Sequence, residues 1–152
     1  MADPLPPRVT EERMAEALQR FRKIVGNDWV FTGEAVASYR DPYTISNDER
    51  LYKARAAVAP ESTEQVQEIV KVANEFRVPL WTVSRGKNFA YGGAAPVLSG
   101  SVVLDLGRMN RILEVNEKFG YALVEPGVSY FDLYKYIQDR GMKLWLDVPD
   151  PG

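Results

Sequence analysis

The sequence predicts an α+β fold, and three observations support this prediction. Apolar residues recur at helical spacing in three separate stretches. Short apolar runs bounded by turn residues lie between those stretches and are typical of strands. The chain of 152 residues, with 45% hydrophobic and 26% charged residues, is long enough to bury a core. We therefore expect one domain, or two small subdomains that share a sheet.

The first helix is expected after Thr10, a typical N-cap residue that two acidic residues follow. Gly26–Asn27 is a helix stop signal. Residues 29–31 form a short apolar piece, and residues 38–50 are typical of a long surface loop. We describe residues 1–50 as an N-terminal helix and loop arm. The apolar stripe of the helix consists of Met14, Leu18, Phe21 and Val25.

A βαβ unit follows this arm. Residues 56–59 are a short apolar run that predicts a strand, and residues 78–83 predict a second one. Between them, Ser62 and Gln65 have the spacing of a capping box. A helix between two apolar runs indicates that the runs pair in parallel with a right-handed crossover. The apolar stripe of this helix consists of Val66, Ile69, Val70, Ala73 and Phe76.

The remainder of the chain predicts three strands and one helix. The strands are expected at 101–106, 112–115 and 121–124, with a turn at Glu125–Gly127. Ser129 can cap a helix that carries Tyr130, Leu133 and Ile137 and ends at Gly141. Trp145 and Leu146 look like a strand that enters a structure beyond Gly152. We therefore expect this chain to be an N-terminal piece of a larger protein.

The composition excludes several classes of chemistry. The chain has no cysteine and no histidine, so it has no disulfide, no Ser-His-Asp triad and no Cys or His metal ligand. Acid–base chemistry must use a perturbed carboxylate, tyrosine or lysine, or a bound cofactor. The formal net charge of −2 gives no field that attracts nucleic acid. We expect no metal and no nucleic-acid partner.

No targeting or membrane segment is recognised. Residues 1–7 are rich in proline and lack the apolar region of a signal peptide. No run approaches the roughly 18 apolar residues that a membrane-spanning helix needs. We therefore expect a cytoplasmic protein without a membrane partner.

The loop from Ser84 to Ala95 is the most informative stretch. Its glycines can turn backbone N–H groups toward a ligand, and Arg85 and Lys87 add positive charge, so the loop suits a phosphate. It lacks the spacing of a P-loop, and it does not open a helix as a Rossmann fingerprint does. From spacing alone, a plain surface loop with a Gly-Gly turn explains the pattern equally well.

Four segments together resemble the vanillyl-alcohol oxidase / p-cresol methylhydroxylase family of flavoproteins, with eugenol-oxidase-like members most similar. They are GKNFAYGGAAP (86–96), LDLGRMNRILEVN (104–116), YALVEPGV (121–128) and LDVPD (146–150). The resemblance implies a PCMH-type FAD-binding domain with FAD as cofactor. It divides the chain into a first FAD-binding subdomain at 51–98, with a pyrophosphate loop at 84–95, and an incomplete second subdomain at 99–152.

The resemblance also implies site residues. Tyr91 matches a tyrosine that binds the phenolic oxygen of the substrate as a phenolate. Asp150 matches an aspartate near the flavin that assists hydride transfer and hydration or deprotonation of the intermediate. An ordinary aromatic residue and an ordinary turn aspartate are the alternatives for these two positions. The cofactor-binding residues implied are Ser84, Arg85, Gly86, Lys87, Asn88, Phe89, Ala90, Tyr91, Gly92, Gly93, Pro126 and Gly127.

The chemistry implied by the resemblance is oxidation of a para-alkyl phenol, such as vanillyl alcohol, eugenol or a 4-alkylphenol. A hydride leaves the benzylic carbon for flavin N5, and oxygen reoxidises the flavin. The alternative is a 4-cresol dehydrogenase flavoprotein coupled to a cytochrome c subunit; LDVPD favours the oxidase branch. Further alternatives are an inactive truncated fragment and a stand-alone nucleotide-binding module. The expected partners are a phenolic substrate, the missing C-terminal part of the same enzyme and further copies in a homo-oligomer.

The sequence departs from the family pattern in places. Ala90 stands where relatives usually have glycine, so a backbone angle there can differ. Pro151–Gly152 follows LDVPD where relatives often have leucine and glycine. Because the chain has no histidine, it cannot itself supply a histidyl–flavin bond.

Overall fold

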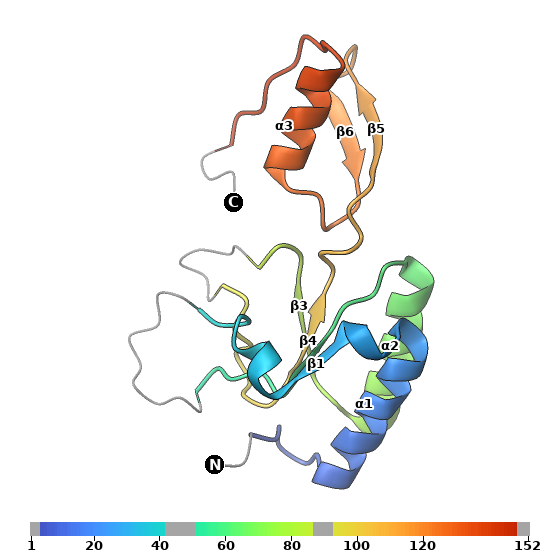
Figure 1. The fold of residues 1–152 in the computed structure, drawn as a ribbon, viewed down its shortest axis with the longest axis vertical. Coiled ribbons are helices and arrows are strands. Elements are labelled where there is room, and N and C mark those ends of the chain that lie inside the picture. The colour runs from blue at the N-terminus through green and yellow to red at the C-terminus, as the bar shows by residue number, and fades with distance from the viewer. Residues whose placement is uncertain (1–3, 42–50, 87–92, 149–152) are drawn as a thin grey trace.

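The computed structural model describes residues 4–41, 51–86 and 93–148. Figure 1 shows two parts joined at the end of β4: a four-stranded sheet with two helices, and a hairpin with one helix. The elements are α1 (Glu11–Val25), η1 (Asn27–Trp29), β1 (Val30–Thr32), η2 (Gly33–Val36), β2 (Ala56–Val58), α2 (Thr63–Phe76), β3 (Leu80–Val83), β4 (Val102–Asp105), β5 (Ile112–Asn116), β6 (Tyr121–Val124) and α3 (Tyr130–Asp139).

The four-stranded sheet has the order β1-β2-β4-β3. β4 is parallel to both β2 and β3, and β1 pairs antiparallel with β2. The expected direct pairing of 56–59 with 78–83 is therefore wrong, although both strands run in parallel in one sheet. β4 separates them because its continuous apolar run, Val102–Leu104, is buried on both faces, as a central parallel strand requires.

The four-stranded sheet contains strands from all three of the units expected from the sequence, which are residues 1–50, 51–98 and 99–152. β1 comes from the 1–50 unit, and β4 comes from the 99–152 unit, yet both pair with β2. The N-terminal segment thus contributes one strand, β1, to the first sheet. For the division into two FAD-binding subdomains we now propose a boundary after β4, where Figure 1 shows the chain leaving the sheet.

Helices α1 and α2 cover one face of this sheet and form its main core. Thr10 caps α1 by accepting a hydrogen bond from the Arg13 N–H, as the sequence predicts, and the whole expected apolar stripe of α1 is buried. In α2, Val70 is 39% exposed and Val72 is buried instead. The core includes Met14, Phe21, Val58, Ile69, Val102 and Leu104.

The expected capping box of α2 is only half formed. The Ser62 hydroxyl accepts from the Gln65 N–H at 3.3 Å, but the Gln65 side chain accepts from the Glu61 N–H and not from Ser62. A full box occurs at α3, where the Asp132 carboxylate and Ser129 bond each other reciprocally. The sequence predicted Ser129 as the cap of this helix, but not the reciprocal bond from Asp132.

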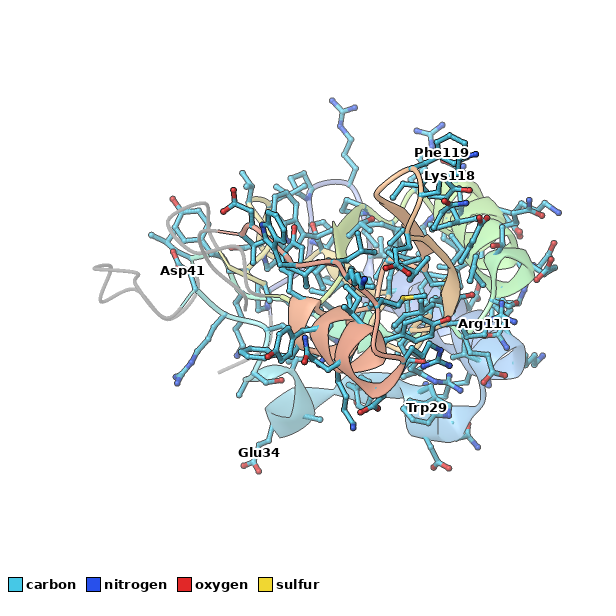
Figure 2. The ribbon with its side chains drawn as sticks, turned by 90° about the horizontal axis from the view of Figure 1, so that it is seen from above. Trp29, Glu34, Asp41, Arg111, Lys118 and Phe119 are labelled. Atoms are coloured by element: carbon cyan, nitrogen blue, oxygen red, sulfur yellow. The ribbon has the colours of Figure 1, made fainter. Side chains whose placement is uncertain are left out.

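The second part begins with the antiparallel hairpin of β5 and β6. Glu125 closes its base by accepting from the Arg111 backbone N–H at 2.8 Å and from Arg111 Nη2 at 2.6 Å. Lys118 and Phe119 form the exposed tip of the hairpin (Figure 2). Residues 144–148 form no strand, contrary to the expectation for Trp145 and Leu146. No helix in the described ranges combines the length and apolar character that crossing a bilayer demands.

Candidate functional site

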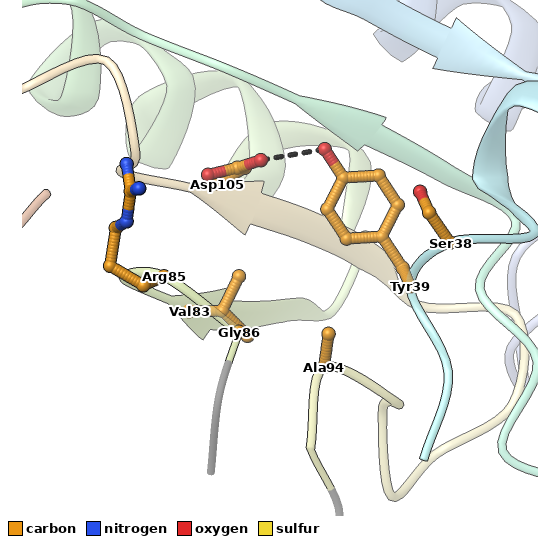
Figure 3. Close-up of a pocket in the computed structure, with 7 residues that line it drawn as sticks. All are labelled: Ser38, Tyr39, Val83, Arg85, Gly86, Ala94 and Asp105. Carbon is orange, nitrogen blue, oxygen red and sulfur yellow. Dashed lines mark hydrogen bonds between the residues drawn. The ribbon is translucent and has the colours of Figure 1, made fainter. Parts of the chain in front are cut away.

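A cavity of about 230 Å³ lies at the carboxyl ends of β3 and β4. The carboxyl edge of a parallel sheet is where ligands bind in open α/β folds. Three segments line the cavity: the turn after η2, the two ends of the glycine-rich loop, and the end of β4 (Figure 3). The lining residues are Ser38, Tyr39, Val83, Arg85, Gly86, Ala94 and Asp105.

The pleat of the sheet brings these residues to one face. Side chains alternate along a strand, so Ala56, Val58 and Leu104 face the helices while Ala57 and Val103 face the other side. On that other side they pack with Val36, Ala54, Val83 and Ala94, and with the half-buried rings of Phe31, Tyr39 and Trp81. The cavity therefore lies on the sheet face opposite the helices, at its carboxyl edge.

Tyr39 and Asp105, two of the described lining residues, are joined by a short hydrogen bond. The Tyr39 hydroxyl donates to Asp105 Oδ2 at 2.6 Å, and the Gly107 N–H donates to Asp105 Oδ1 at 2.8 Å. Burial raises the pKa of the Tyr39 hydroxyl, and its hydrogen bond to the Asp105 carboxylate raises it further. The hydroxyl therefore stays protonated and remains a donor throughout the physiological pH range.

Arg85 and Gly86 open the glycine-rich loop at the mouth of the cavity. Gly86 has φ +70°, a conformation that residues with a Cβ rarely adopt, and a Cβ there would lie 3.2 Å from the Ala94 Cβ. Two hydrogen bonds from Ser129 hold the pKa of the Asp132 carboxyl below its usual range, and the charge of Arg85 contributes to that effect.

The turn at Pro126–Gly127 packs against the backbone that follows Asp105 and does not line the cavity. Pro126 is exposed, but Gly127 is buried, and its N–H donates to the Met109 carbonyl at 2.7 Å. A Cβ on Gly127 would lie 2.6 Å from the carbonyl oxygens of Leu106 and Gly107. The absence of a side chain at 127 thus allows two backbone segments to touch beside Asp105.

The structure describes only part of the predicted site. It brings Arg85 and Gly86 into the cavity, and it buries Gly93, with φ +55°, on the returning side of the loop. Ser84 is exposed and is not part of the lining. The predicted site residues that lie outside the described residues are Lys87, Asn88, Phe89, Ala90, Tyr91, Gly92 and Asp150.

Sequence reasoning missed Ser38, Tyr39 and Asp105. Ser38 and Tyr39 begin the stretch that we predicted to be a surface loop, but Tyr39 is half-buried against the sheet. One signal was available for Asp105, since a single carboxylate ends the apolar run Val102–Leu104. A polar residue at that position of a parallel strand lies at the edge where ligands bind.

The described residues fit an anionic group. Positive charge comes from Arg85, the Ser38 hydroxyl is exposed, and the glycine backbone permits close approach. The volume is below the roughly 300–1,000 Å³ of complete small-molecule sites, so the cavity matches one portion of a larger ligand, such as a diphosphate. Among the described side chains, the buried Trp81 Nε1 is a donor without a hydrogen-bond partner on this same face.

Comparisons with known proteins agree with this geometry. A family model described as "FAD binding domain" matches residues 54–152. The 4-cresol dehydrogenase (hydroxylating) flavoprotein subunit of Pseudomonas putida is 39% identical over 147 residues, which cover 97% of this chain and 28% of that protein.

Two solved structures are similar along almost the whole chain. The 4-ethylphenol oxidase from Gulosibacter chungangensis, in an isoeugenol complex, gives a TM-score of 0.90 at 45% identity over 95% of this chain and 28% of its own. The p-cresol methylhydroxylase with substrate bound gives a TM-score of 0.91 at 39% identity over 97% of this chain and 28% of its own. The chain therefore spans about 28% of the length of these relatives.

Proposed function

Since the chain belongs to the FAD binding domain family and forms the FAD-binding part of a flavoprotein similar to p-cresol methylhydroxylase and 4-ethylphenol oxidase, we propose that the whole protein oxidises para-alkyl phenols. Two observations together carry this proposal. The chain holds a cavity between both ends of its glycine-rich loop, and it is 45% identical to an enzyme named for 4-ethylphenol.

Bound FAD supplies the hydride acceptor for this reaction. The role of the described residues is to hold the cofactor and orient it. Arg85 places a positive charge at the cavity, where it attracts a diphosphate. Gly86 bends the backbone so that the loop can follow an anion closely. We further propose that Ser84–Gly93 and Pro126–Gly127 contribute the remaining contacts on this side of the cofactor.

The two proposed catalytic residues are Tyr91 and Asp150. The Tyr91 hydroxyl would donate to the phenolic oxygen and stabilise its negative charge while the hydride leaves. Asp150 would act on the other side of the substrate, assisting hydride transfer and then hydration or deprotonation of the oxidised intermediate. Support for both roles comes from the sequence match of their segments to the flavoprotein family.

For the electron acceptor we propose oxygen. The LDVPD segment resembles the oxidase branch, and the identity to an oxidase, 45%, exceeds the 39% identity to the 4-cresol enzyme. The alternative is a partner cytochrome c subunit, as in the cytochrome-coupled branch of the family. We also propose that the complete enzyme forms a homo-oligomer.

Anaerobic flavin reduction tests this proposal in the longest natural polypeptide that contains residues 1–152. The protein should purify with a flavin absorption spectrum, and a 4-alkylphenol should bleach it. Tyr91→Phe removes one hydrogen bond to a charged oxygen, worth about 1.5–3 kcal/mol, so phenolic inhibitors should bind roughly tenfold to a hundredfold more weakly. Asp150→Asn should leave inhibitor binding nearly unchanged and slow flavin reduction. Wild-type behaviour of both variants would contradict the assigned roles.

A further inference from the structure

Tyr39 lies outside the part of the chain that matches the family model, yet it lines the cavity. The match begins at residue 54, whereas the cavity takes Ser38 and Tyr39 from the turn after η2. Tyr39 is fixed there by two contacts. Its N–H donates to the Val36 carbonyl at 3.0 Å, and its ring lies 6.4 Å from that of Phe31. The N-terminal segment thus supplies one wall of the site.

Asp105 presents an electrostatic problem for a site that holds an anion. Its carboxylate lies in the same cavity as Arg85, and a carboxylate facing a diphosphate repels it. In the structure each oxygen of this carboxylate accepts a hydrogen bond from a neutral donor. One oxygen accepts from the Tyr39 hydroxyl at 2.6 Å, and the other accepts from the Gly107 N–H at 2.8 Å. Figure 3 shows the hydroxyl pointing at the carboxylate, with Arg85 beyond it.

We propose that Tyr39 is a positioning residue for FAD, acting through Asp105. Its hydroxyl engages Asp105 Oδ2 and so keeps this carboxylate turned away from the cofactor diphosphate and from Arg85. The inference rests on the proposed function, because it takes the anion in the cavity to be the diphosphate of FAD.

Loss of the Tyr39 hydroxyl would leave Asp105 Oδ2 without the only donor that the described residues give it. A carboxylate oxygen in that position either repels the diphosphate or pairs with Arg85, the cation that lines the cavity. Both outcomes weaken binding of an anion. Both also disappear when the charge at 105 is removed, and this separates an electrostatic role for Tyr39 from simple packing.

The experiment measures FAD dissociation constants for four proteins, each as the apo form of the longest natural polypeptide that contains residues 1–152. Tyr39→Phe should weaken FAD binding about tenfold or more, because a charge-assisted hydrogen bond is lost beside an anion. Asp105→Asn removes the charge while its side-chain oxygen can still accept from the Gly107 N–H, so its FAD affinity is the reference for the double variant. The double variant Tyr39→Phe/Asp105→Asn should recover most of the affinity lost in Tyr39→Phe.

A matched control is available in the hairpin. The Tyr121 hydroxyl donates to Glu114 Oε1 at 2.5 Å, so Tyr121→Phe removes a similar tyrosine–carboxylate bond away from the cavity. It should leave FAD affinity unchanged. Thermal unfolding of the four apo proteins and this control shows whether each is folded before FAD is added.

The outcomes distinguish a failure of the positioning role of Tyr39 from a failure of the proposed function. Unchanged FAD affinity in Tyr39→Phe would overturn the positioning role while leaving the proposed function intact. Weak binding that Asp105→Asn does not rescue would overturn the electrostatic argument and leave Tyr39 as a packing residue. No FAD binding by the unsubstituted protein would overturn the proposed function and this inference with it.

Discussion

Gly127→Ala should destabilise the chain because the position has no room for a methyl group. A Cβ there would lie 2.6 Å from the carbonyl oxygens of Leu106 and Gly107 and 2.8 Å from the Gly107 carbonyl carbon. Real Cβ contacts stay above 3.0 Å, so the backbone must move by about 0.4 Å. The neighbouring atoms all belong to the main chain and cannot rotate away as a side chain could.

The expected cost follows from this geometry. Overpacking a tight site usually costs about 1–3 kcal/mol. We expect the upper part of that range, about 2–3 kcal/mol, because the Gly127 N–H also donates to the Met109 carbonyl at 2.7 Å and holds the turn in place. Such a loss increases the unfolded-to-folded ratio roughly 30-fold to 150-fold.

Urea unfolding followed by tryptophan fluorescence measures this cost, with Gly120→Ala as the matched control. Gly120 has φ +65° and no atom within 4 Å of a built Cβ, so alanine there meets only conformational strain, about 1 kcal/mol. If Gly127→Ala costs no more than Gly120→Ala, the close approach of the two backbone segments is not a structural requirement.

Two other substitutions probe the core and the hairpin. Phe21→Ala should cost about 3–5 kcal/mol in urea unfolding because Phe21 is fully buried, and a loss below 1 kcal/mol would contradict the assigned core. Glu125→Gln should make the free energy of unfolding less dependent on pH. Hydrogen bonds from the Arg111 side chain hold the pKa of the Glu125 carboxyl below its usual range, so its contribution is complete above about pH 4.3 and disappears as pH falls through the lowered value. The free energies of unfolding of wild type and variant should therefore differ at pH 7, and the difference should shrink as the pH falls below about 4.3. A difference that stays constant over this acid titration would refute this.

The elements themselves could be predicted from the sequence because their signals are local. The stripe from Met14 to Val25 repeats at helical spacing, and Thr10 caps the helix that contains it. The strand at 102–105 is a continuous apolar run, and such runs are typical of buried parallel strands. The order of strands was not predictable in the same way. Nothing within 56–83 indicates that a later strand inserts between β2 and β3.

In the candidate site, too, residues with a local sequence signal were predicted, and residues that depend on long-range contacts were not. Arg85 and Gly86 were predicted because the glycine-rich loop is contiguous and its residue types suit phosphate. Tyr39 was missed because its partner, Asp105, is 66 residues away, and a tyrosine in a polar stretch gives no sign of that contact. Gly127 was predicted as a turn residue, but its close approach to Gly107 depends on how two distant backbone segments pack.

Asp105 connects the hydrogen bond of Tyr39 with the close approach of Gly127 to Gly107, and this connection gives a last prediction. Its carboxylate receives one bond from Tyr39 and one from the Gly107 N–H, and Gly107 is the residue that a Cβ on Gly127 would displace. The free-energy effects of two substitutions are coupled when both residues act on one shared group, whereas the effects of substitutions at distant sites are additive. The double variant Tyr39→Phe/Gly127→Ala should therefore raise the FAD dissociation constant by less than the product of the two single-variant fold-increases. Tyr39→Phe combined with Gly120→Ala should instead be additive within about 0.5 kcal/mol. Fluorescence titration of FAD into the apo variants measures both cycles. Equal additivity in the two cycles would mean that Gly127 and Tyr39 do not act through Asp105, and that the turn at 126–127 supports the fold alone.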